Sequence, residues 1–293
     1  MSATVQVIRP GFVAEIGNVD LRTVIAPDDV AIIQNAVDNH PVLVFRGPTL
    51  TNDQHIAFSK NFGNLSRATE YQKDPMKRRL GGEMTDASNL SEDNQVLGAG
   101  DRRRMNNLGS RRWHTDGSYK ALSGKYSLLH CHTEIADGGQ TQFADMRGGY
   151  DALPERMKQL IDKLVVVHSI FYSREVVGFG GFSPEEQSTL PQARHPLVRV
   201  HPASGRKSLY ISSHAWHIEG WPIPEGIDLL HELTEYATQP DNVYTHQWQV
   251  GDLTMWDNRF TMHRARRHWP ETAVRDMRRT TIEEAAPPLQ QAA

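Results

Sequence analysis

The sequence predicts a mainly β protein, a β-sandwich or barrel with a few helices packed outside it. Short apolar runs bounded by turn residues outnumber helical patterns, which is typical of strand-rich folds. These runs do not alternate regularly with helices, and this disfavours a doubly wound parallel sheet. A chain of 293 residues that is 38% hydrophobic can build one such domain, because all-β domains often reach this length.

Six segments carry the strand pattern. The run Val42-Leu43-Val44-Phe45 lies between Pro41 and Gly47, which predicts a short buried strand. Turn sequences such as Asp137-Gly138-Gly139 and Ala203-Ser204-Gly205 separate later apolar runs. The other expected strands, in chain order, cover residues 126–132, 164–171, 197–201, 208–212 and 253–256.

Four segments show the apolar spacing of helices. Pro27–Asn39 begins with a proline and two acidic residues, and Thr51-Asn52-Asp53-Gln54 is a capping box that starts a second helix. A third helix is expected to begin at Leu153-Pro154-Glu155, and a fourth to cover residues 227–237. The apolar stripes of the first, third and fourth helices are Val30, Ile33 and Val37; Met157, Leu160, Ile161 and Leu164; and Leu229, Leu230 and Leu233.

The composition argues against several classes of protein. A near balance of 32 basic and 35 acidic residues disfavours a binder of nucleic acid. No apolar run approaches the ~18–20 residues that cross a bilayer, so no membrane association is expected. The start of the chain, Met1-Ser2-Ala3-Thr4-Val5, lacks a basic leader followed by an apolar core. The single Cys131 cannot form an internal disulfide and suits a reducing compartment, so we expect a cytoplasmic protein.

Neither a repeat nor a long linker divides the chain. We therefore expect a single domain over residues 1–284. Residues 285–293 contain too little apolar mass to pack and are expected to form a disordered tail. The number of chains in the assembly stays open, and a homo-oligomer is one of the alternatives.

The chain contains fourteen histidines, and histidine is the commonest metal ligand. An iron(II) enzyme that activates oxygen uses two histidines and one carboxylate on one face of the metal. The triplet His114-Thr115-Asp116 would supply two of these ligands, because residues i and i+2 of a strand point to the same side. Similar His-x-acid triplets, His132-Thr133-Glu134 and His217-Ile218-Glu219, make the pattern weak in isolation, and an isolated triplet is more often made of surface or capping residues.

The surroundings of the triplet strengthen the metal hypothesis. Trp113 precedes it and Gly117-Ser118-Tyr119 follows it. Far downstream, an apolar strand lies between the turns at Gly251-Asp252 and Asp257-Asn258-Arg259, and His263 follows soon after. A histidine beyond such a strand can return to a metal held by an earlier segment.

With these motifs the chain resembles the TauD/TfdA family of Fe(II)- and 2-oxoglutarate-dependent dioxygenases. Within the family it is most similar to the 2,4-dichlorophenoxyacetate dioxygenase branch. The family motifs occur in order at Val44-Phe45-Arg46-Gly47, Trp113-His114-Thr115-Asp116, Gly138-Gly139-Gln140-Thr141, Trp256-Asp257-Asn258-Arg259, His263 and Arg275-Asp276-Met277-Arg278-Arg279-Thr280-Thr281. The branch is supported by Asp145-Met146-Arg147 to Leu153-Pro154, Gly205-Arg206-Lys207, Gly251-Asp252 to Arg259 and His214-Ala215-Trp216-His217-Ile218-Glu219-Gly220.

The resemblance implies that His114, Asp116 and His263 bind iron(II). Neutral imidazoles and a hard carboxylate suit this ion, and three protein ligands leave three coordination positions. In family members, 2-oxoglutarate occupies two of these positions and O2 the third. The resemblance also implies a double-stranded β-helix, or jelly roll, with helices packed around it. This agrees with the strand-rich pattern described above.

The same resemblance assigns the residues that bind the organic ligands. Arg275, twelve residues after His263, matches the arginine that binds the far carboxylate of 2-oxoglutarate, and Thr141 matches a threonine that assists it. Arg279 matches the arginine that meets the anionic group of the substrate. The alignment leaves a shift by one residue to Arg278 open, but an extended strand would place Arg275 and Arg279 on one face.

Two further histidines, His214 and His217, align with the phenoxyacetate branch and are candidates for substrate contact. A buried histidine satisfied by a backbone carbonyl is nevertheless the commoner case. Trp256 either lines the iron pocket or belongs to the core. We assign three other histidines to structure, namely His130, His132 and His168.

Two arginine-rich runs and one glycine-rich run have simpler interpretations. Arg102-Arg103-Arg104 and Arg264-Ala265-Arg266-Arg267 are expected to form a solvated face or a rim that steers anions. Gly178-Phe179-Gly180-Gly181 lacks the strand-to-helix setting of a phosphate loop, so we expect a flexible lid or turn.

The implied activity is hydroxylation of a small anionic substrate, with 2-oxoglutarate converted to succinate and CO2. For an aryloxyacetate, the hydroxylated product is a hemiacetal that collapses to a phenol and glyoxylate. Three alternatives stay open: an alkylsulfonate substrate such as taurine, a zinc-dependent hydrolase, and a non-catalytic binding module on the same scaffold.

Overall fold

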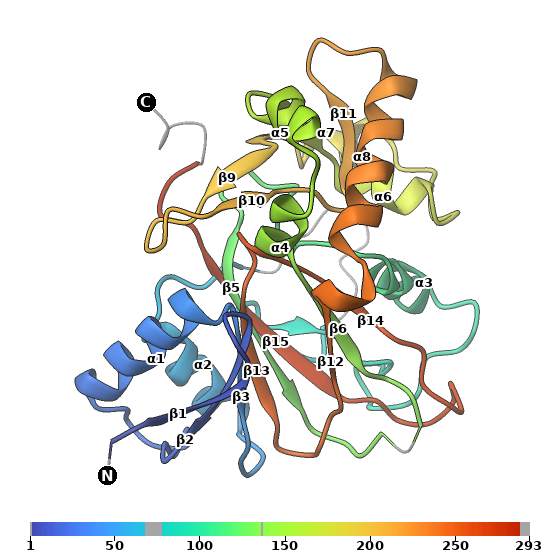
Figure 1. Cartoon of the computed structure of the whole chain (residues 1–293). Helices are drawn as coiled ribbons and strands as arrows, with labels where there is room; N and C mark the ends of the chain where they lie inside the picture. The colour runs from blue at the N-terminus through green and yellow to red at the C-terminus, as the bar shows by residue number, and fades with distance from the viewer. Residues whose placement is uncertain (1, 68–77, 136, 288–293) are drawn as a thin grey trace.

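The computed structural model of the chain describes residues 2–67, 78–135 and 137–287 (Figure 1). Several sheets with helices at the periphery make up the described part, so the expected mainly β class is confirmed. The end of the expected tail, residues 288–293, lies outside the described residues. Within the described part, no helix combines the length and apolar character needed to cross a bilayer.

The largest sheet contains strands from both ends of the chain. Neighbouring strands are antiparallel except β2 and β3, which are parallel. The strand order is β1 (Thr4–Arg9), β2 (Val13–Gly17), β3 (Val42–Phe45), β13 (Leu253–Asp257), β5 (Gly124–Cys131), β15 (Met277–Glu283) and β4 (Thr85–Asp86).

A second sheet packs against one face of the large sheet. Its order is β12 (Val243–His246), β6 (Thr141–Asp145) and β14 (Thr261–Ala265), all antiparallel. Phe143 from β6 belongs to the same buried cluster as Val44 and Trp256 from the large sheet. Because side chains alternate along a strand, Leu43 and Phe45 point to the opposite face.

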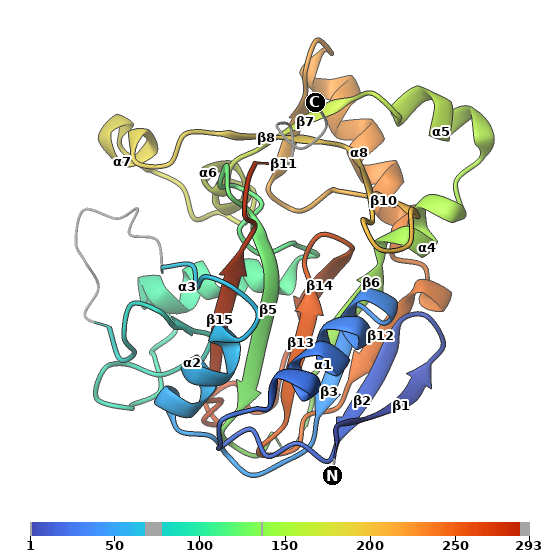
Figure 2. The ribbon, with the colours of Figure 1, turned by 90° about the vertical axis from the view of Figure 1, so that its left-hand side faces the viewer.

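Two helices cover that opposite face, α1 (Pro27–Asn39) and α2 (Asn52–Lys60) (Figure 2). Ile33 of α1 and Phe58 of α2 pack with Leu43 and Phe45 in one buried cluster. Thr51 caps α2 as the sequence predicts. Its hydroxyl accepts a hydrogen bond from the Gln54 backbone N–H, and the Gln54 side-chain oxygen accepts one from the Thr51 backbone N–H. The large sheet therefore has helices on one side and the second sheet on the other.

Most of the remaining elements lie above the second sheet in the view of Figure 1, whereas α3 (Arg102–Leu108) lies to its side. Helix α8 (Ile223–Ala237) supplies Leu229, Leu230 and Leu233 to the core of this upper part. The other strands and helices are β7 (Val165–His168), β8 (Ala193–Pro196), β11 (Ala215–Ile218), β9 (Val198–Val200), β10 (Lys207–Leu209), α4 (Met146–Asp151), α5 (Glu155–Ile161), α6 (Ile170–Glu175) and α7 (Pro184–Ser188). Two 3-10 turns, η1 (Gly109–Arg111) and η2 (Pro240–Asn242), complete the list.

Several sequence predictions differ in detail from this structure. The strand expected at 208–212 ends at Leu209, and Leu164 lies beyond the end of helix α5 at Ile161. The strand expected at 164–171 ends at His168, because the Ser169 hydroxyl accepts from the Tyr172 backbone and starts helix α6. Leu160, a member of the apolar stripe expected for the third helix, is 49% exposed. Helix α8 begins at Ile223 rather than at residue 227, directly after Pro222.

The glycine-rich run at residues 178–181 is a turn between α6 and α7. Gly178 and Gly181 have φ values of 80° and 82°, which side-chain-bearing residues rarely adopt. Phe179 and Phe182 are buried against Phe171, so aromatic packing anchors the turn.

A buried ion-pair network fixes the start of β15, the strand that carries Arg279. Asp276 accepts hydrogen bonds from Arg79 at 2.7 Å and from Arg278 at 2.7 Å. Burial alone would raise the pKa of Asp276, but the hydrogen bonds and charges of Arg79 and Arg278 lower it well below its usual value. This carboxylate therefore stabilises the folded chain at neutral pH.

Substitution of Asp276 by asparagine should lower the free energy of unfolding at pH 7 by about 3 kcal/mol, because a buried carboxylate that pairs with two arginines is lost. Among the described residues, Arg79 keeps only Asp86 as an acidic partner, and the partly buried Arg278 keeps only Asn52 as a hydrogen-bond partner. A depressed carboxyl pKa contributes stability above the unfolded value of ~3.9, and this contribution is lost as pH falls. The deficit should therefore narrow below about pH 4. Urea unfolding at several pH values measures the difference in free energy of unfolding between the wild type and the variant. Asp241→Asn, at an exposed position, serves as the control. A difference that stays constant down to acid pH would contradict the prediction.

Candidate active site

A backbone bridge brings together two of the predicted metal ligands. His114 forms an isolated antiparallel bridge with His263 on β14, in which each N–H donates to the carbonyl of the other residue at 3.0 and 2.8 Å. Their ring centroids are 4.1 Å apart. The triplet thus makes one bridge rather than a continuous strand, and the Thr115 side chain turns away into the buried interior.

Asp116 lies at the turn that follows. Gly117 has a φ of 69°, and a Cβ there would lie 2.9 Å from the Gly124 nitrogen, so a glycine is needed for the chain to enter β5. One potential ligand atom from each of His114, Asp116 and His263 lies within 4.8 Å of the other two. All three side chains are buried. Among the described residues, this is the only group of histidine, cysteine and acidic side chains with such spacing.

The Asp116 carboxylate is held ionised by its neighbours. Its Oδ2 accepts from the Ser127 hydroxyl at 2.7 Å, and its Oδ1 accepts from Nη1 of Arg279 at 2.6 Å. Burial by itself raises the pKa of this group, but it is lowered to about 2, with the charge of Arg279 as the largest lowering cause and the hydrogen bond from Ser127 as a further one. Asn258 fixes the same turn by accepting from the Asp116 backbone and donating to Ser127.

The two histidines are held in their neutral form. Burial lowers the pKa of His114 and lowers that of His263 well below its usual value. The Nδ1 atom of His114 lies 2.8 Å from the Arg112 carbonyl, so it carries the proton and leaves the Nε2 lone pair available. That Nε2 atom lies 3.7 Å from Asp116, and the Nε2 of His263 lies 3.6 Å from the same carboxylate. Neutral imidazoles and an ionised carboxylate are the donor forms that a metal requires.

The cluster opens into a cavity of about 240 Å3. Five residues singled out from the sequence besides the three cluster members line it: Thr141, Trp256, His214, Arg275 and Arg279. The other lining residues are Thr85, Asp86, Ala87, Asn106, Asn107, Gly109, Ser110, Tyr119, Leu129, Ile170, Arg174 and Ala265.

Arg275 is a buried cation in this cavity with no acidic partner among the described residues. Its Nη1 donates to the Ala87 carbonyl at 3.1 Å and its Nη2 to the Gly139 carbonyl at 3.5 Å, while Nε has no partner there. Burial lowers the pKa of Arg275 to about 10, so the guanidinium stays charged at neutral pH. Thr141 lies in the same cavity, where its hydroxyl accepts from Trp248 at 3.1 Å.

Neighbouring arginines on β15 point to different places. Arg279 lines the cavity and contacts Asp116, whereas Arg278 donates to Asp276 and to Asn52. In the register, Arg278 lies opposite His130 of β5 and Arg279 opposite Leu129, as alternation along a strand requires. Of the two, Arg279 is the one placed to reach a ligand in the cavity.

The two histidines of the phenoxyacetate-type motif are not equivalent. His214 lies in the cavity, 6.3 Å from the His114 ring, and its Nδ1 bonds with the Ser173 hydroxyl. Burial lowers the pKa of His214 well below its usual value, and the charge of Arg174 lowers it further. His217 lies on β11 and is not among the residues that line the cavity.

The remaining sequence candidates belong to the packed interior around the site. Trp256 is fully buried, lines the cavity and donates from Nε1 to Asn258. The Nδ1 atom of His130 lies 2.8 Å from the Nε2 atom of His132, and His168 bonds with the Ser118 hydroxyl at 3.1 Å. None of these three histidines lines the cavity.

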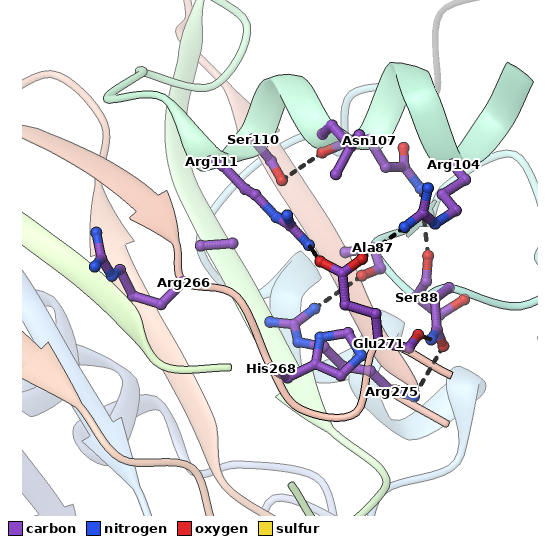
Figure 3. A pocket seen from close by; sticks show the side chains of 13 residues that line it. Ala87, Ser88, Arg104, Asn107, Ser110, Arg111, Arg266, His268, Glu271 and Arg275 are labelled. Carbon is purple, nitrogen blue, oxygen red and sulfur yellow. Dashed lines mark hydrogen bonds and ion pairs between the residues drawn. The ribbon is translucent and has the colours of Figure 1, made fainter. Parts of the chain in front are cut away.

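A second, smaller cavity of about 70 Å3 adjoins the first and shares Arg275 with it (Figure 3). Glu271 lies at its centre and accepts from Arg104 at 2.7 Å and Arg111 at 3.0 Å. The arginine-rich runs are therefore not simply solvated. In the first run Arg104 pairs with Glu271, and Arg103 pairs with Asp101 and Glu92; in the second, Arg267 pairs with Glu271.

Several functional residues were not identified from the sequence. Arg174 and Asn106 line the cavity from segments that carry no recognised motif, whereas Tyr119 lies directly after the predicted triplet but was given no role of its own. Ser127, which bonds with Asp116, lies within an expected strand and has no distinguishing neighbour in the sequence. Asn258 lies in the motif Trp256-Asp257-Asn258-Arg259, so the sequence marked its position, although it did not predict its contact with the Asp116 turn.

Comparison with known proteins agrees with this geometry. Residues 4–281 match the family described as "Taurine catabolism dioxygenase TauD, TfdA family". The chain is 41% identical over 281 residues to the alpha-ketoglutarate-dependent 2,4-dichlorophenoxyacetate dioxygenase of Burkholderia sp. (strain RASC), covering 96% of this chain and 94% of that protein. It is 35% identical over 253 residues to the (S)-phenoxypropionate/alpha-ketoglutarate-dioxygenase of Sphingobium herbicidovorans, covering 84% and 83%.

A solved structure is also closely similar. AAD-2, crystallised in complex with Mn(II) and N-oxalylglycine, superimposes with a TM-score of 0.90 at 39% sequence identity, over 98% of this chain and 99% of that one. The sequence match over nearly the whole chain, the similar fold and the His-Asp-His cluster lead to one conclusion. This protein belongs to the TauD/TfdA family of dioxygenases.

Proposed function

We propose that the protein is an Fe(II)- and 2-oxoglutarate-dependent dioxygenase that hydroxylates an aryloxyacetate. The observation that carries the proposal is one cavity that joins a His-Asp-His cluster to a buried arginine without an acidic partner in the described chain. The relatives at 41% and 35% identity carry names that specify aryloxyalkanoate substrates, which favours the same substrate class here.

We propose His114, Asp116 and His263 as the iron ligands. The buried, neutral imidazoles and the ionised carboxylate fit iron(II), which accepts nitrogen and oxygen donors in a facial arrangement of two histidines and one carboxylate. Iron(II) bound there would supply the activation of O2 that is coupled to decarboxylation of 2-oxoglutarate. Ser127 and Arg279, through their hydrogen bonds to Asp116, keep the carboxylate oriented.

We propose Arg275 and Thr141 as the residues that bind the far carboxylate of 2-oxoglutarate. A guanidinium can bind a carboxylate through two parallel hydrogen bonds, and the burial of Arg275 strengthens this attraction by excluding water. The carbonyls of Ala87 and Gly139 hold the guanidinium in place without neutralising it. An incoming dianion would therefore meet an unneutralised positive charge.

We propose that the substrate lies between apolar and cationic groups of the same cavity. Arg279 would contact the anionic group, while Tyr119, Leu129 and Ile170 offer apolar surface for an aromatic ring. His214 is the histidine placed to contact substrate, and the earlier suggestion of His217 has no support from the cavity lining. Fixing the carboxylate holds the adjacent C–H bond at a constant position relative to the metal ligands.

An aryloxyacetate, 2-oxoglutarate and O2 give a phenol, glyoxylate, succinate and CO2. One oxygen atom enters succinate and the other enters the carbon between the ether oxygen and the carboxylate. The resulting hemiacetal breaks at its C–O bond to release the phenol.

The fold proposal is a double-stranded β-helix within a single domain over residues 1–284. Its support is the pair of sheets packed face to face, with His263 on β14 of one sheet and Ser127 on β5 of the other. Because β1 and β15 belong to the same sheet, the first and last strands share one core.

Succinate formation by protein reconstituted with Fe(II), 2-oxoglutarate and O2 tests the function. Aryloxyacetates should stimulate succinate release and give phenol in equal amount, whereas 2-aryloxypropionates and short sulfonates serve as competitors in the same panel. If none stimulates turnover above the uncoupled background, the aryloxyacetate proposal fails. If taurine stimulates most, the alkylsulfonate alternative replaces it.

The dependence of turnover on the metal ion and on O2 distinguishes the dioxygenase from a zinc-dependent hydrolase. A dioxygenase requires O2 and loses activity when Zn2+ replaces Fe2+. Turnover of 2-oxoglutarate that zinc restores and that removal of oxygen leaves unchanged would contradict the dioxygenase.

A further inference from the structure

The charges in the larger cavity do not balance. Its acidic residues are Asp86 and Asp116, and its cations are Arg174, Arg275 and Arg279. Asp86 is neutralised by Arg79 from outside the cavity, at 2.8 and 2.9 Å, and Asp116 by Arg279. Within the described part of the chain, Arg174 and Arg275 therefore have no acidic partner.

Arg174 is held at the cavity by hydrogen bonds that leave its charge unneutralised. Its Nε donates to Oδ1 of Asn106 at 2.7 Å, and its Nη1 donates to the Ser173 hydroxyl at 3.4 Å. Ile170 lies four residues earlier on α6, on the same face of the helix, and also lines the cavity. Helix α6 thus presents a cation next to an apolar side chain.

Gly109 provides the space for this guanidinium. A Cβ at position 109 would lie 2.3 Å from Nη1 and 2.8 Å from Cζ of Arg174. The backbone at Gly109 has a φ of −56°, which any residue adopts. Gly109 is therefore needed because a side chain would collide with Arg174, and not because the backbone adopts a conformation that only glycine allows.

We propose that Arg174 binds the anionic group of the substrate and so determines specificity for acids. This inference rests on the function proposed above. Two anions enter one cavity in that reaction. Among the described residues, two cations of this cavity have no acidic partner: Arg275, which would bind 2-oxoglutarate, and Arg174, which would bind the substrate carboxylate. Arg279 keeps its hydrogen bond to Asp116 and adds a second contact to the same substrate group.

The test compares an acid with its neutral analogue. Binding of 2,4-dichlorophenoxyacetate and of its primary amide is measured by calorimetry, with the protein loaded with Mn(II) and N-oxalylglycine. For Arg174→Gln, the Kd of the acid should rise by about 10- to 100-fold, since a charge-assisted bond is lost, and that of the amide by less than about 3-fold. Turnover should show the same pattern in KM for the acid.

Two further variants strengthen the test. Gly109→Ala should weaken binding of the acid in the same direction, because the new methyl group displaces the guanidinium without removing its charge. Arg194→Gln removes one positive charge from an exposed pair with Glu219 and should leave both affinities unchanged.

The outcomes separate this inference from the function on which it rests. Equal weakening of acid and amide by Arg174→Gln would mean that Arg174 only shapes the cavity, and would overturn the proposal. Unchanged affinity for the acid in that variant would overturn it as well. In both cases a wild-type protein that converts the acid would leave the dioxygenase function intact, whereas a wild-type protein that never forms succinate would refute the function itself.

Discussion

Replacement of His114 by alanine is expected to abolish coupled turnover and to weaken metal binding by at least about 100-fold, because one of the three proposed ligands is lost. The variant should still fold, since the bridge between residues 114 and 263 uses backbone atoms only. Mn(II) binding by calorimetry and 2-oxoglutarate decarboxylation measure the two effects independently.

The control for this substitution is His231→Ala, which removes an exposed histidine of α8. It should bind metal and form succinate as the wild type does. Full decarboxylation of 2-oxoglutarate by the His114 variant would show that the ligand assignment is incorrect.

Replacement of Arg275 by glutamine is expected to raise the KM for 2-oxoglutarate by about 100-fold, with a smaller change in kcat. The reason is the loss of a buried charge that would pair with the far carboxylate of the cosubstrate. Steady-state kinetics with varied 2-oxoglutarate measures this effect.

The same substitution, although it should impair cosubstrate binding, should not lower the thermal stability of the ligand-free protein. A buried guanidinium surrounded by carbonyl groups and without an acidic partner in the described chain is unfavourable, as its lowered pKa of about 10 indicates. The ligand-free glutamine variant should therefore unfold at the same temperature as the wild type or at a higher one. A lower unfolding temperature together with an unchanged KM would mean that Arg275 is a structural residue.

The site could be located from the sequence because its residues lie in ordered motifs. His114 and Asp116 form one triplet, His263 follows a recognisable strand, and the spacing to Arg275 completes the set. The structure brings the three predicted ligands together and places Arg275, Thr141 and Arg279 around one cavity. A proline followed by two acidic residues predicted the start of α1, and a capping box predicted the start of α2.

What the sequence could not predict depends on contacts between distant segments. Arg174 reaches the cavity because Gly109, on another segment, leaves room for it, and neither residue belongs to a recognised motif. Ser127 bonds with Asp116 only because β5 passes beside the turn. The end of β7 at His168 was missed because the apolar run continues, while one serine hydroxyl starts a helix.

The backbone bridge between His114 and His263 also couples metal binding to folding. It joins two segments far apart in the chain before any metal arrives, so the ligands need little reorganisation. A metal that binds only the folded chain raises its free energy of unfolding by RT ln(1 + [M]/Kd), about 2.7 kcal/mol at a hundredfold excess over Kd. The melting temperature thus becomes a reporter of site occupancy. A shortage of metal would lower the number of folded molecules as well as the fraction that is active.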